Sequence, residues 1–65
     1  AAYTTVKEKI DVFEKRLSAL KTAGKDVYDI EVELKMARDK MSQGLFKMAE
    51  TYVQSIETRI KGMGG

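Results

Sequence analysis

The sequence predicts an all-α fold, a three-helix bundle whose helices run up, down and up. Three stretches of the chain carry apolar residues spaced alternately three and four positions apart, which gathers side chains on one face of an α-helix. Glycine interrupts this pattern at Gly24 and again at Gly44, where the chain is expected to turn. The three stretches are similar in length, as the helices of a bundle need to be.

The first helix is expected to cover about residues 5–23. Thr5 is followed three positions later by Glu8, the spacing of a capping box, so residues 1–4 are expected to lie before the helix. Gly24 comes soon after the last apolar position and is expected to end the helix. The predicted inward-facing residues are Val6, Ile10, Phe13, Leu17 and Leu20.

The second helix is expected to cover about residues 27–43, with Asp26 as its N-cap. Acidic residues crowd its first two turns and basic residues its later turns, an order that suits the dipole of one helix with its own start and end. The predicted inward-facing residues are Val27, Ile30, Leu34, Ala37 and Met41.

Residues 42–44, with the sequence SQG, predict a tight turn in which Gly44 takes a positive φ angle. The alternative is one continuous helix from Asp26 to Met63, because the apolar period nearly survives through Gly44 and Leu45 is a poor N-cap. In that case the chain would form an elongated two-helix hairpin or a coiled-coil dimer.

The third helix is expected to cover about residues 45–62 and has the widest apolar face of the three. Its predicted inward-facing residues are Phe46, Ala49, Val53, Ile56, Ile60 and Met63, with Leu45, Met48 and Tyr52 on one flank. These side chains fill an arc of roughly 160°, which suits a helix covered by two neighbours. Residues 62–65, with the sequence GMGG, are expected to form a flexible tail.

Composition excludes several classes of function. The 65 residues make one domain at most, and they include no cysteine and no histidine. A zinc site therefore lacks its usual ligands, and no side chain is suited to act as a base near neutral pH. We expect no catalytic residues, no cofactor and no metal, and the acidic residues Asp26, Asp29, Glu31 and Glu33 are explained by the helix dipole. No apolar run approaches the ~20 residues of a membrane span.

A second apolar line on the middle helix is the strongest candidate for a binding surface. Tyr28, Val32 and Met36 are spaced four residues apart and point about 180° away from the inward-facing residues. Val12 is a similar but isolated residue on the first helix. We expect a non-enzymatic structural or protein-interaction module that uses these three residues to bind itself or another helical protein.

A small nucleic-acid-binding module is the alternative function. Lys35, Arg38, Lys40 and Lys47 are the candidate contacts. Net charge is only +2, and acidic residues at positions 39 and 50 dilute the patch, so nucleic-acid binding is not the expected function.

The stretch from Ala37 to Ala49, in which Gly44 separates two amphipathic helices, resembles the helical hairpins of tetratricopeptide-type repeats. It is also similar to hairpins in long helical regions of archaeal surface and coiled-coil proteins. Leu45 stands where such hairpins usually carry a polar cap, and the sequence holds no second copy of the unit. The resemblance implies a scaffold or partner-binding role and supplies no catalytic residues.

Overall fold

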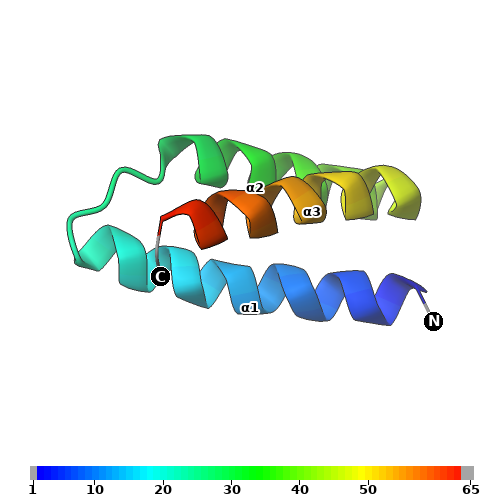
Figure 1. The fold of residues 1–65 in the computed structure, drawn as a ribbon. Helices are drawn as coiled ribbons and strands as arrows, with labels where there is room; N and C mark the ends of the chain where they lie inside the picture. Colours follow the sequence, from blue (N-terminus) through cyan, green and yellow to red (C-terminus); the bar gives the residue numbers. More distant parts are fainter. Residues whose placement is uncertain (1, 64–65) are drawn as a thin grey trace.

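The computed structural model describes residues 2–63, which form three α-helices: α1 (Ala2–Thr22), α2 (Tyr28–Ser42) and α3 (Phe46–Gly62). The helices lie side by side and alternate in direction, so the predicted up-down-up bundle is confirmed (Figure 1). The described part of the chain extends 34 × 18 × 16 Å. A continuous helix from Asp26 to Met63 would be ~57 Å long, so the elongated alternative is wrong.

The turn at Gly44 is built as the sequence predicts. Gly44 has a φ angle of 78°, the N–H of Leu45 donates to the carbonyl of Lys40 at 2.9 Å, and the N–H of Gly44 donates to the carbonyl of Met41 at 3.0 Å. This pair of hydrogen bonds is the Schellman motif, which satisfies carbonyls that the last turn of a helix leaves open. Gly24, with a φ angle of 86°, ends α1 with the same motif.

Replacing Gly44 with alanine is expected to lower the free energy of unfolding by about 1–2 kcal/mol, because an L-residue is strained at positive φ. A Cβ added at Gly44 meets nothing within 4 Å, so the cost comes from the backbone alone. Gly62→Ala is the matched control, because Gly62 is helical and a Cβ there also meets nothing within 4 Å. Urea denaturation should show a loss for the first variant and no loss for the second; equal stabilities would contradict the strained turn.

The predicted capping box at Thr5 and Glu8 is wrong. α1 begins at Ala2, so both residues lie inside the helix. The ring of Tyr3 packs against that of Phe46 with their centroids 5.4 Å apart. This contact between α1 and α3 stabilises a first turn that local sequence signals place outside the helix.

The starts of α2 and α3 and the end of α3 are close to their predicted positions. Asp26 accepts a hydrogen bond from the N–H of Tyr28 at 3.2 Å, so it satisfies a free donor of the first turn although Val27 occupies the N-cap position. Leu45 occupies the N-cap position of α3 without a side-chain cap. Of the predicted tail, Gly62 is the last residue of α3, and Gly64 and Gly65 lie outside the described residues.

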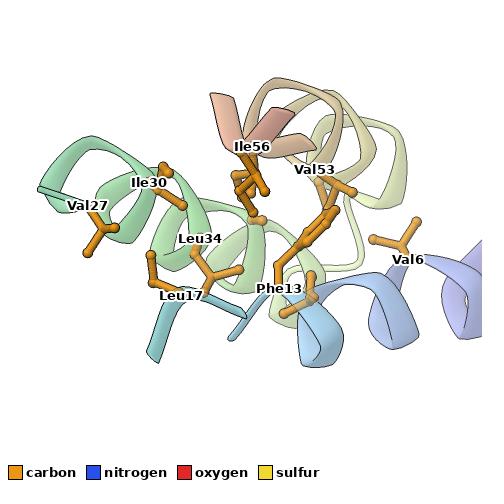
Figure 2. Close-up of a cluster of buried hydrophobic side chains, with 12 residues drawn as sticks. Val6, Phe13, Leu17, Val27, Ile30, Leu34, Val53 and Ile56 are labelled. Carbon is orange, nitrogen blue, oxygen red and sulfur yellow. The ribbon is translucent and has the colours of Figure 1, made fainter. Parts of the chain in front are cut away.

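One core fills the space between the three helices (Figure 2). Its buried residues are Val6, Ile10, Phe13, Leu17, Val27, Ile30, Leu34, Ala37, Ala49, Val53, Ile56 and Ile60. Leu20, Met41, Tyr52 and Met63 are partly buried against it. Nearly all the inward-facing residues that the apolar spacing predicts are therefore confirmed.

Phe46 is the exception, and the prediction that it lies in the core is wrong. Its side chain is 36% exposed, and Leu45 and Met48 are also exposed. Phe46 belongs to the first turn of α3, ahead of Ala49, which is the first buried residue of that helix. Along α3 the core begins only at Ala49. Phe46 therefore lies beyond this end of the core, where its ring packs against that of Tyr3.

Candidate interaction surface

The face of α2 that points away from the core carries an exposed apolar stripe. Tyr28 is 69% exposed, and Val32 and Met36 are each 40% exposed. The buried residues of the same helix, Ile30, Leu34 and Ala37, are 6% exposed or less. We call Tyr28, Val32 and Met36 the outer stripe of α2.

Polar contacts to α1 fix one edge of α2. Glu31 lies 3.4 Å from the Nζ of Lys21, and Arg38 forms an ion pair with Glu14. All four side chains are more than one-third exposed, so these ion pairs contribute little to stability. They orient two charged side chains of α2 toward α1 and away from the outer stripe.

The other edge of α2 is tied to α3 through Glu33, which is the least exposed of the paired carboxylates. Its Oε1 accepts from Nε of Arg59 at 2.5 Å, and its Oε2 accepts from the hydroxyl of Ser55 at 2.6 Å. Asp29 lies 3.7 Å from the same guanidinium. Within the described residues, every buried side-chain nitrogen or oxygen atom has a hydrogen-bond partner.

These contacts set the register between α2 and α3. Because Glu33 lies opposite Ser55 and Arg59 on an antiparallel helix, Met36 lies near the level of Tyr52, and Met48 lies one turn of α3 further along. Met48 is 46% exposed and Tyr52 is half-buried. Apolar surface therefore continues from the outer stripe of α2 toward α3. The sequence signal for this extension is the spacing of Met48 and Tyr52 on one flank of the third helix.

The acidic residues near the start of α2 do not gather around one point. Asp26 accepts from the N–H of Tyr28, Glu31 faces α1, and Asp29 and Glu33 share Arg59. Among residues 2–63, no group of three or more side chains suitable as metal ligands comes together.

The candidate nucleic-acid contacts are also dispersed. Arg38 is paired with Glu14, while Lys35 lies on the exposed side of α2. Lys40 is two residues beyond Arg38, which places it about 160° away around the helix axis. Lys47 is in the first turn of α3.

No helix in the described part of the chain combines the length and apolar character needed to cross a membrane. No protein-family model matches the sequence, and no curated protein or solved structure is significantly similar to it.

Proposed function

We propose that this chain is a non-enzymatic structural and protein-interaction module that associates with itself through the outer stripe of α2. The observation that carries the proposal is the exposure of Tyr28, Val32 and Met36 in one line, on a helix whose opposite face is fully used by the core. Isolated exposed apolar residues are common, but aligned ones are typical of a surface that receives another helix.

The small size of the domain supports association. A bundle of 65 residues buries a limited fraction of its surface, so its folded state is only marginally favoured. A partner that binds only the folded state raises the free energy of unfolding by mass action. A second helix laid on the outer stripe would bury apolar surface that the bundle itself leaves in water.

The expected affinity is weak. Completing the burial of each stripe residue is worth roughly 1–1.5 kcal/mol, or roughly 6–9 kcal/mol for six side chains in a symmetric pair. Association costs about 4–15 kcal/mol in lost freedom of motion. At the low end of this cost the net gain reaches at most about 5 kcal/mol, so we expect a dissociation constant of about 0.2 mM at the tightest and otherwise in the millimolar range.

The pairing of Glu33 supports a non-enzymatic role. This side chain is the least exposed of the paired carboxylates, and it is held by Arg59 and Ser55 as part of the α2–α3 contact. The nucleic-acid alternative has less support, because Arg38 is paired with Glu14 and Lys40 lies on a different side of α2.

Replacing both Val32 and Met36 with glutamate is expected to abolish self-association while the chain stays helical, because burying four unpaired carboxylates per dimer is strongly unfavourable. Light scattering at millimolar concentration measures the mass, and circular dichroism checks the fold. Val12→Glu is the matched control, because Val12 is a 54% exposed valine on α1 outside the outer stripe. Loss of association in the control, or its survival in the double variant, would remove the outer stripe from the interface.

A further inference from the structure

Charged residues around the outer stripe of α2 are arranged symmetrically about Val32, with their signs exchanged. Lys25, in the connection that precedes α2, and Asp39, near the end of α2, lie seven residues before and after Val32, and Asp29 and Lys35 lie three residues before and after it. The apolar residues follow the same symmetry, since Tyr28 and Met36 are each four residues from Val32. All four charged residues are exposed.

We infer that the partner of the outer stripe is a second copy of this chain, with the two α2 helices packed antiparallel about a two-fold axis near Val32. Reversing one copy brings Lys25 toward the partner's Asp39 and Asp29 toward the partner's Lys35, and each of these contacts occurs twice. Tyr28 then lies near the partner's Met36. This inference rests on the proposed function and adds the identity and direction of the partner.

Charge favours the antiparallel arrangement over the parallel one. In a parallel pair in register, each residue would face its own copy, so lysine would meet lysine and aspartate would meet aspartate. Antiparallel packing converts all of these repulsive contacts into attractive ones. Lysine side chains are long enough to reach across the stripe to the partner's aspartates. Salt screens these exposed contacts, so they are strongest at low ionic strength.

The required side chains remain available in the folded chain. Asp29 is 73% exposed and its contact to Arg59 is long, at 3.7 Å. Asp39 uses one carboxylate oxygen to accept from the amide of Gln43 at 3.2 Å, which leaves its other oxygen for a further donor. The ion pairs of Glu31 and Arg38 point toward α1, outside this surface.

Charge exchange at Lys25 and Asp39 tests the direction of packing. Lys25→Asp and Asp39→Lys should each weaken association about tenfold at low salt, because each creates two like-charged contacts per dimer. The variant that carries both changes should return to the affinity of the unaltered chain. The fold should tolerate both changes, since a new acid near the start of α2 and a new base near its end suit the helix dipole.

A disulfide test gives an independent measure of direction, because the chain has no cysteine of its own. Mixing a Lys25→Cys chain with an Asp39→Cys chain should give a mixed disulfide under mild oxidation. The Asp39→Cys chain alone should give little, because its two copies would lie ~21 Å apart along antiparallel helices, well beyond disulfide reach.

The outcomes separate the two proposals. If the unaltered chain associates and Val32→Glu/Met36→Glu abolishes this association, the outer stripe forms the interface. If, in addition, charge exchange has no effect and the Asp39→Cys chain cross-links with itself, the antiparallel inference is wrong. If the unaltered chain is monomeric at all concentrations, both proposals are wrong. Weakening by each single charge change, restoration by the pair and the mixed disulfide would together establish the antiparallel dimer.

Discussion

Replacing Ile56 with alanine is expected to lower the free energy of unfolding by about 2–5 kcal/mol, the range for removing a large aliphatic side chain from a packed core. Ile56 is 0% exposed and belongs to α3, which packs on both other helices. The core of a bundle of this size rarely supplies more than about 3–5 kcal/mol of stability. The variant should therefore be largely unfolded at room temperature.

Circular dichroism during urea denaturation measures this effect, at concentrations low enough to keep the chain monomeric, since association raises the apparent stability. Ile56→Val is the matched control and should cost only about 0.5–1.5 kcal/mol, because it removes one methylene group. An alanine variant that loses less than about 1 kcal/mol would mean that Ile56 is not enclosed by the three helices.

Replacing Ala49 with leucine is expected to destabilise the bundle by about 1–3 kcal/mol, although leucine is an excellent helix former. Ala49 on α3 and Ala37 on α2 are both 0% exposed, so these small side chains occupy closely packed positions between the helices. Leucine at position 49 adds three carbon atoms where no space is available. The helices must then separate or the side chain must take a strained rotamer.

Ala19→Leu is the matched control for this substitution. Ala19 lies on the exposed side of α1, so the same change meets solvent there and should leave the free energy of unfolding within about 0.5 kcal/mol of the original. If thermal melting shows that Ala49→Leu is as stable as the original chain, the helices do not approach each other closely at this position.

Apolar spacing predicted most of this fold because each helix places one narrow face on the core. Ile30 lies three residues after the buried Val27, and Ile60 lies four residues after the buried Ile56, so each shares a helix face with another core residue. The turns at Gly24 and Gly44 were predictable for a different reason. Both have positive φ angles that glycine adopts without strain, and both lie where the apolar pattern is interrupted.

Features that depend on contacts between helices could not be predicted in this way. The first turn of α1 rests on the Tyr3–Phe46 contact, which joins residues far apart in the sequence. Local signals at Thr5 and Glu8 indicated a later start, and the helix overrides them. Phe46 kept the spacing of the core residues but lies beyond the end of the core, which periodicity alone does not reveal.

The same distinction applies to the candidate interaction surface. The outer stripe of α2 could be found from the sequence because Tyr28, Val32 and Met36 lie opposite the core-facing residues of a single helix. For the extension toward Met48, the sequence places Met48 and Tyr52 on one flank of α3, but the part of α2 that this flank meets depends on the register between the two helices. Glu33 sets this register through Arg59 and Ser55, and the sequence does not indicate this pairing.

Sedimentation equilibrium of the unaltered chain, from about 20 µM to about 2 mM, tests the central proposal most directly, because this range brackets the tightest expected dissociation constant. A self-associating bundle predicts an average mass that rises with concentration from the 7.3 kDa of one chain toward twice that value. A mass that stays at 7.3 kDa throughout the range would contradict self-association through the outer stripe.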